Sequence, residues 1–318
     1  MWAALRCAGR LFSAGGRHKG AVSIFESRYP CPEDRNDPRG VFLWERVTRG
    51  ECPLMNRAIR NRLAHLLLGA FDNAARSEAI LRLALFCELC GDRGQPRVAA
   101  DVFDSAWAAR YPEAVARRWS APEAVAELEG LIEVRGSTDV PGSGGQALGL
   151  QRAVTPWYEP HPDVLPFLTT VGERVRIYAD VVRRVREERN AFERLDPLRR
   201  GVAEAAACFN AGLFFEAHEH LEGHWRDLAP TPTKRFVQGL IQISVGFHHA
   251  MRGSYQGAVN QLDKGLSKLG DAPEGALGLD CDLFAREVGA TRRQMVSRGR
   301  QGMRKAALHE CPQMHLRC

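Results

Sequence analysis

The stretch "FFEAHEHLEGHW" at residues 214–225 decides the fold of the C-terminal half. It places three histidines, three glutamates and three large aromatic residues within about three helical turns. At a rotation of about 100° per residue, His218 and Glu222 lie in the same stripe as the aromatic side chains, with Glu219 at the flank. We therefore expect an amphipathic helix that buries His218 and Glu222. The polar side chains expected on its opposite, solvated face are Glu216, His220 and His224.

A following helix offers partners for these buried polar groups. It is predicted to start at Thr231 and Pro232 and to continue to Arg252, with apolar residues on one side and amides and a histidine on the other. Because an unpaired buried polar group costs several kcal/mol, we expect the two helices to share a polar centre. The side chains expected in this centre are His218, Glu219, Glu222, Trp225, Gln238, Gln242 and His249.

Three interpretations of the polar centre stay open. A hydrogen-bond network that fixes the helix register needs no ligand, and we favour it. A metal site of His218, Glu222 and His249 would offer ligand types suited to zinc, manganese or iron. General acid–base catalysis by His218 and a carboxylate is the third interpretation. A zinc-protease site is improbable, because "HEHLE" has Glu222 where the motif HExxH has its second histidine.

Capping and breaking residues divide the C-terminal half into antiparallel helices. Asp196 with Pro197 starts one helix, and Asn210 with Gly212 ends it. The helix that contains residues 214–225 runs to about residue 227. Gly253 ends the next helix, and the last of the four reaches about residue 269. The expected fold class is all-α, with a helical N-terminal region and a small C-terminal antiparallel helical bundle.

The N-terminal half also shows helical periodicity, from about Pro53 to Glu133, and "SAPEAVAELEGLI" begins with Ser120 in capping-box register. Three helices followed by "LIEVRG" leave open a winged helix that binds DNA. No basic recognition helix is evident, so we favour a small structural bundle. The pair of cysteines in "CELC" at 87–90 has no second pair at zinc-finger spacing, which favours two buried thiols on a helix.

Composition divides the chain further. Residues 1–35 form a basic leader, which is either a mitochondrial or plastid transit peptide or a basic start without a targeting role. Residues 36–135 form a helical domain of unknown role, and a linker rich in Pro and Gly covers 136–166. The helical bundle spans 167–306, and a tail covers 307–318.

Charge and hydropathy limit the partners. The net charge is +6, but four basic residues and no acidic one fall within residues 1–25, which leaves 40 basic against 38 acidic residues in the body. A nearly neutral body argues against nucleic acid as the partner. No apolar run reaches the roughly 20 residues that a membrane-spanning helix needs. We expect a soluble protein, in the cytoplasm or in an organelle if the leader is a transit peptide, whose partner is a protein or a second copy.

Motifs that would indicate an enzyme are absent. The sequence contains no GxxxxGK[ST], no GxSxG and no GxGxxG, so nucleotide hydrolysis, serine hydrolase chemistry and dinucleotide binding have no motif behind them. We favour a binding or scaffold domain. The alternatives are a metal-dependent hydrolase that uses His218, Glu222 and His249, and nucleic-acid binding through the N-terminal helices.

The segments "FNAGLFFEAHEHLEGHW" and "QGLIQISVGFHHAMRGSYQGA" resemble the domain of unknown function 309 family, over about residues 201–270. The resemblance implies a small all-helical domain without an assigned activity. Ser254 departs from the family, whose members usually have Asn after the glycine at 253. The positions that match the family pattern are Phe209, Asn210, Gly212, Phe215, Glu216, His218, Glu219, Glu222, Trp225, Gln238, Gly239, Gln242, His249 and Gly253.

Three of these glycines carry a structural expectation of their own. Gly212 and Gly253 are expected at positive φ at helix ends. Gly239 in the middle of a helix costs about 1 kcal/mol relative to Ala, so we expect a neighbouring helix to pack closely there.

Overall fold

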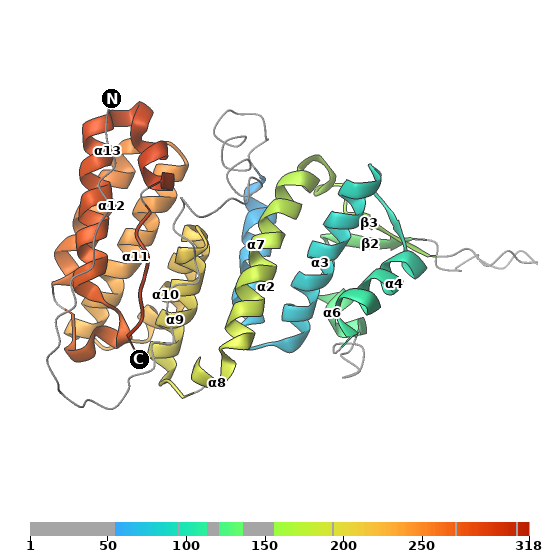
Figure 1. Ribbon diagram of the computed structural model, residues 1–318, viewed down its shortest axis with the longest axis horizontal. Helices are drawn as coiled ribbons and strands as arrows, with labels where there is room; N and C mark the ends of the chain where they lie inside the picture. The colour runs from blue at the N-terminus through green and yellow to red at the C-terminus, as the bar shows by residue number, and fades with distance from the viewer. Residues whose placement is uncertain are drawn as a thin grey trace, which may run out of the picture.

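The computed structural model describes residues 55–94, 96–112, 121–135, 156–192, 194–270, 272–309 and 311–317. It is predominantly helical, which confirms the predicted fold class. Figure 1 shows the C-terminal helices at one end of the molecule and a small sheet with its covering helices at the other, with α2 and α7 between them. The predicted basic leader and the predicted cap at Ser120 lie outside the described residues.

Two long helices begin the described chain. They are α2 (Arg57–Ala70) and α3 (Ala74–Arg93). Asn56 and Asn73 cap them, since each side chain accepts a hydrogen bond from a backbone N–H of the first turn. The two cysteines predicted to be buried on a helix lie on α3, where Cys90 is buried and Cys87 is half-buried. Burial raises the pKa of Cys87 to about 12 and that of Cys90 to about 11, so both are neutral thiols.

A small antiparallel sheet follows, which the sequence did not predict. Its strands are β1 (Val98–Ala99), β2 (Ile132–Arg135) and β3 (Trp157–Pro160), and their order is β1-β3-β2. The helices α4 (Ala100–Arg110) and α6 (Ala121–Ala126) lie between β1 and β2 in the chain. The interpretation of residues 36–135 as a simple helical bundle is corrected, because β1 and β2 lie within this range and pair with β3. Residues 157–160, expected in the linker, form the central strand.

The helix α7 joins the two halves. It spans Leu168–Glu187 after the short η1 (Leu165–Phe167), and α8 (Arg189–Phe192) follows it. Its apolar stripe is buried, including Val171, Val175 and Val182. The helix packs mainly on α3 and also contacts α2 and α9, although the sequence grouped it with the C-terminal bundle. At Gly172 a Cβ atom would lie 2.9 Å from Cβ of Cys87, so α7 and α3 approach closely.

The C-terminal bundle has the four predicted helices, which are α9 (Pro197–Asn210), α10 (Phe214–Arg226), α11 (Pro232–Met251) and α12 (Tyr255–Leu269). A further helix that was not predicted, α13 (Cys281–His309), follows η2 (Glu274–Gly278). Asp196 and Thr231 cap α9 and α11 as expected. Gly212 and Gly253 have positive φ, as predicted. Ser254 stands at the start of α12, but its side chain makes no capping bond.

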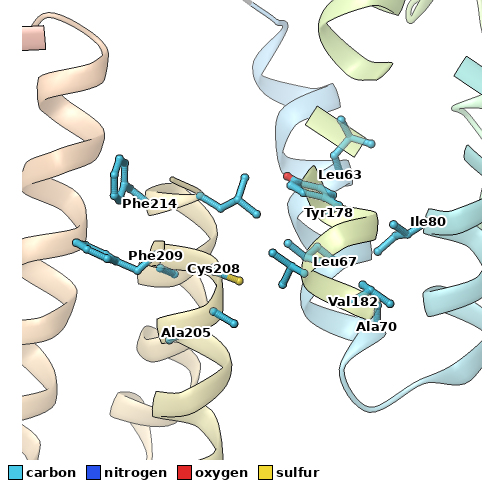
Figure 2. Packing of buried hydrophobic residues seen from close by; sticks show 14 of the residues in the cluster. Leu63, Leu67, Ala70, Ile80, Tyr178, Val182, Ala205, Cys208, Phe209 and Phe214 are labelled. Carbon is cyan, nitrogen blue, oxygen red and sulfur yellow. The ribbon is translucent and has the colours of Figure 1, made fainter. Parts of the chain in front are cut away.

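One hydrophobic core runs through both halves. Phe209 of α9 packs its ring against Phe247 of α11 and Phe284 of α13, at centroid distances of 5.5 Å and 5.6 Å. Figure 2 shows that Cys208, the neighbour of Phe209, points the other way, toward Leu67 and Tyr178 of α2 and α7. The helix α9 is therefore covered on two sides. Of the helices in the described ranges, none combines the length and the apolar character needed to cross a bilayer.

Candidate functional site

The candidate site is built on α10, and its central residue is Glu216. This side chain is fully buried, with 0% of its surface exposed, so the expectation of a solvated Glu216 is wrong. The expectation assumed that α10 is covered only on the side that faces the other C-terminal helices. In the structure α10 also contacts α2, and Glu216 reaches α7. A helix covered from two directions buries a residue that a single apolar stripe places outside.

Two side chains of α7 hold the Glu216 carboxylate. Arg174 donates hydrogen bonds to Oε1 from Nε at 3.2 Å and from Nη2 at 2.5 Å. The Tyr178 hydroxyl donates to the same oxygen, and Arg174 Nε also lies 3.0 Å from that hydroxyl. The second oxygen, Oε2, is buried without a hydrogen-bond partner among the described residues. A charged hydrogen-bonded pair of this kind links α7 and α10 at one point.

The pKa values of this group follow from burial and charge. Burial raises the pKa of Glu216. The Arg174 charge and the hydrogen bonds from Arg174 and Tyr178 lower it by more than burial raises it, so the pKa lies below its ordinary value. Burial alone would lower the pKa of Arg174, and the carboxylate raises it above its ordinary value instead. Both groups are therefore ionised at neutral pH.

Further cations surround the pair. The Arg60 guanidinium, from α2, lies 4.2 Å from the centre of the Phe215 ring. Burial, and then the charges of Arg252 and Arg174, lower the pKa of Arg60. Burial and the nearby arginines lower the pKa of His248 to about 4, so this histidine is neutral at pH 7.

His218 lies beside this group rather than inside it. Its Nε2 is 3.0 Å from Oε1 of Glu219, its Nδ1 is buried without a hydrogen-bond partner in the described part of the chain, and its side chain is 14% exposed. Glu222 is one-third exposed and accepts a bond of 2.9 Å from Arg226. His218, Glu219 and Glu222 each offer a ligand atom within 4.8 Å of the others.

The remaining residues of the predicted polar centre lie elsewhere. Lys268 of α12 donates to the Gln242 side chain at 2.6 Å. His249 also faces α12, because a Cβ atom at Gly257 would lie 3.0 Å from its ring. Trp225 lies under Lys234, whose Nζ is 4.8 Å from the ring centre, and Gln238 is half-buried. The polar side of α11 therefore meets α12, and His249 does not join His218 and Glu222.

Glycines explain why α11 turns this side to α12. A Cβ atom at Gly239 would lie 3.0 Å from Cβ of Lys268 and 3.1 Å from the backbone oxygen of Gly265. The predicted close approach at Gly239 is thus confirmed, and the neighbour is α12. Sequence reasoning could count the small residues on α11 but could not tell which helix would use them.

Sequence reasoning also missed the arginines. Arg174 and Tyr178 are four residues apart on α7, so their side chains lie on one face of the helix. Tyr178 belongs to the buried apolar stripe of α7, whereas an arginine next to such a stripe is ordinarily expected in solvent. The signal in the sequence that could have indicated this site is an arginine four residues before a tyrosine of the apolar stripe. Nothing in the sequence pairs Arg174 with Glu216, which lies 42 residues further on.

His220 was also expected in solvent and is partly buried. Its side chain is 11% exposed, and its Nε2 lies 2.8 Å from Oε2 of Glu204 on α9. The ring also packs edge-on against Phe71, which follows α2. The reason is the same as for Glu216, because residues 71–72 and α9 cover this side of α10.

Comparisons with known proteins concern the same segment. Residues 202–261 match the family model described as "Domain of unknown function (DUF309)". An uncharacterized protein of Aquifex aeolicus (strain VF5) is 28% identical over 79 residues, which are 25% of this chain and 24% of that protein. No solved structure matches the chain significantly. The resemblance to the DUF309 family is thus confirmed for residues 202–261, a segment that contains Glu216 but not its partners Arg174 and Tyr178.

Proposed function

We propose that the family-like helices act as a scaffold that fixes the N-terminal helices α2 and α7, and through them the sheet. The observation that carries this proposal is the complete burial of the Glu216 carboxylate against Arg174 and Tyr178 of α7. Removing a carboxylate from water costs several kcal/mol, which a charged and well-bonded partner offsets. A carboxylate that is fully engaged by a neighbouring helix positions that helix and is not available to react with a substrate.

The other polar groups of α10 and α11 support the same function. Arg226 donates a hydrogen bond to the Glu222 carboxylate, and Lys268 donates one to the Gln242 side chain. His220 is hydrogen-bonded to Glu204. A general base needs access to its substrate, whereas Glu216 has 0% exposure. Internal pairing of this kind favours a module that holds parts of a chain together.

The N-terminal half is the part that the scaffold would present. The helix α6 and the turn after it carry Glu123, Glu127 and Glu129 at the position where a winged helix has its recognition helix. Residues 121–130 contain no basic side chain that could bind phosphates, and the Glu127 carboxylate is already paired with Arg76, which favours a protein partner or a second copy of this chain over nucleic acid. The compartment we propose is the cytoplasm, or a mitochondrion or plastid if residues 1–35 are a transit peptide.

Amide hydrogen exchange tests the scaffold function. In Glu216→Gln we expect faster exchange in α2 and α7, because these helices lose their charged contact with α10, and unchanged protection in α11 and α12. Glu222→Gln is the matched control, since it removes an exposed pair and is expected to leave exchange as in the wild type. Unchanged protection of α2 and α7 in Glu216→Gln would overturn the proposal.

A metal-dependent hydrolase is the second candidate, and one observation favours it. His218, Glu219 and Glu222 have ligand atoms within 4.8 Å of one another, and His218 Nδ1 has no partner within the described ranges. His249, the third residue of the predicted metal set, is turned to α12, so Glu219 would take its place. Stoichiometric zinc, manganese or iron that is lost in His218→Ala would support this candidate against the scaffold.

A further inference from the structure

A second group of metal-ligand side chains lies on the opposite side of α10. It consists of Glu204 from α9 with His220 and His224 from α10, and one ligand atom of each lies within 4.8 Å of the other two. The two histidines are four residues apart, so their rings project from one face, with ring centroids 5.0 Å apart. Two imidazoles and one carboxylate are a donor set that zinc uses in proteins.

A glycine on α9 makes room for this group. At Gly201 a Cβ atom would lie 2.3 Å from Nε2 of His224, closer than side chains tolerate. Glycine inside a helix costs about 1 kcal/mol relative to Ala, and here the space is filled by the imidazole. The ring of His224 is thus seated against α9, beside the pair formed by His220 and Glu204.

The hydrogen bonds of the group also fit metal binding. His220 and Glu204 already share a hydrogen bond of 2.8 Å. No hydrogen bond joins His224 to another side chain in the part of the chain that the structure describes. A neutral imidazole beside a carboxylate is the ligand form that metals require.

The charges around the group are mixed. Arg200 lies 3.9 Å from Oε1 of Glu204 and 3.6 Å from Asp72, which follows α2. Asp72 adds a negative charge to the surroundings of His224, and Phe71 covers the His220 ring. Arg200 approaches the oxygen of Glu204 that does not bond His220, so the oxygen facing the histidines remains available.

We propose that Glu204, His220 and His224 bind one divalent transition-metal ion, with zinc as the favoured ion. The ion would take the place of the hydrogen between His220 Nε2 and Glu204, and His220 would carry its single proton on Nδ1 instead. Three protein ligands leave a further position for water. The site is separate from the His218 group, and it does not depend on the scaffold function proposed above.

Zinc titration of the full chain tests this site. After removal of metals with a chelator, we expect the wild type to bind one Zn²⁺ per chain in competition with a chromophoric chelator. Co²⁺ in place of zinc should give visible absorption bands of a site with nitrogen and oxygen ligands. His224→Gln, on the partly exposed side of α10, should lower the zinc affinity at least about tenfold. His218→Gln is the matched control and should keep the wild-type affinity.

Gly201→Ala provides a variant that keeps all three ligands. Its Cβ atom would displace the His224 ring from its seat, so we expect weaker zinc binding together with a wild-type circular dichroism spectrum. Absence of zinc binding by the wild type would overturn the proposal. Zinc affinity that is lost in His218→Gln and retained in His224→Gln would also overturn it and would support the His218 group instead.

Discussion

At the scale of single residues, the carboxylate of Glu216 receives bonds from one charged and one neutral donor. Arg174 supplies the compensating charge, whereas Tyr178 supplies a hydrogen bond and fills space between α2 and α7. Losing the charge leaves a buried anion without a counter-ion. Losing the hydroxyl leaves the ion pair intact. The two contributions can therefore be separated by substitution.

Tyr178→Phe removes only the hydroxyl. We expect the free energy of unfolding to fall by about 1.5–3 kcal/mol, the range for a hydrogen bond to a charged group. Urea unfolding of the wild type and the variant measures this difference. Phe167, at the start of α7, offers a control for an aromatic change without a buried charge, and Phe167→Leu should cost less than Tyr178→Phe. If Tyr178→Phe lowered the free energy of unfolding by no more than Phe167→Leu does, the proposed role of the hydroxyl would be contradicted.

Two pKa shifts, those of Glu216 and His248, contribute to the dependence of stability on pH. Glu216 has a pKa below 4.5 when folded, so its contribution is present above about pH 4.5 and is lost as the pH falls through the folded value. His248 is lowered from 6.5 to about 4, so the unfolded chain takes up a proton first as the pH falls below 6.5. Both shifts lower stability in acid.

Urea unfolding between pH 7.5 and pH 4 tests this prediction. Between 6.5 and 4, His248 should lower the free energy of unfolding by at most about 1.4 kcal/mol per pH unit. His248→Gln should flatten the profile in this window, and Glu216→Gln should flatten it below about 4.5. A profile of His248→Gln with the wild-type slope between 6.5 and 4 would contradict the assignment.

At the scale of elements, the close pair of helices α11 and α12 depends on glycines. At Gly265 a Cβ atom would lie 2.6 Å from Cγ1 of Ile243 and 2.9 Å from the backbone oxygen of Gly239. At Gly246 it would lie 2.8 Å from the Leu262 side chain. Backbone cannot move aside as a flexible side chain can, so the position of Gly265 is the more demanding of the two.

Gly265→Ala should therefore destabilise the protein. We expect a loss of about 1–3 kcal/mol in the free energy of unfolding, as for overpacked cores. Gly223→Ala on α10 is the control, because a Cβ atom there has nothing within 4 Å, and the helical preference of Ala should stabilise it by up to about 1 kcal/mol. In thermal unfolding we expect the melting temperature to fall in Gly265→Ala and to rise in Gly223→Ala. A shift of both in the same direction would contradict it.

The helices of the C-terminal half could be predicted from sequence because their ends have local causes. The caps at Asp196 and Thr231 and the positive φ at Gly212 and Gly253 depend on neighbouring residues alone. The faces of these helices could be predicted only in part. Glu216 is buried and His220 partly buried by residues that lie 16 to 149 positions away in the chain, which no helical period reports.

At the scale of the whole molecule, α2, α3 and α7 lie between the sheet and the C-terminal bundle (Figure 1). The small sheet could not be predicted from sequence, because β1 has two residues and β3 lies after a stretch rich in Pro and Gly. The small sheet is held together by tertiary pairing, since Val134 pairs with Tyr158 and Val98 with the same tyrosine. Pairing over this distance leaves no local pattern.

The coupling between Arg174 and Glu216 tests the central claim most directly, which is that the family-like helices hold α7 through this pair. Urea unfolding of Arg174→Met, Glu216→Gln and the double variant forms a double-mutant cycle. We expect each single change to cost about 3–5 kcal/mol, and the double variant to cost less than their sum by at least about 2 kcal/mol. Costs that add within about 0.5 kcal/mol would mean that the two residues act independently, and this would contradict the claim.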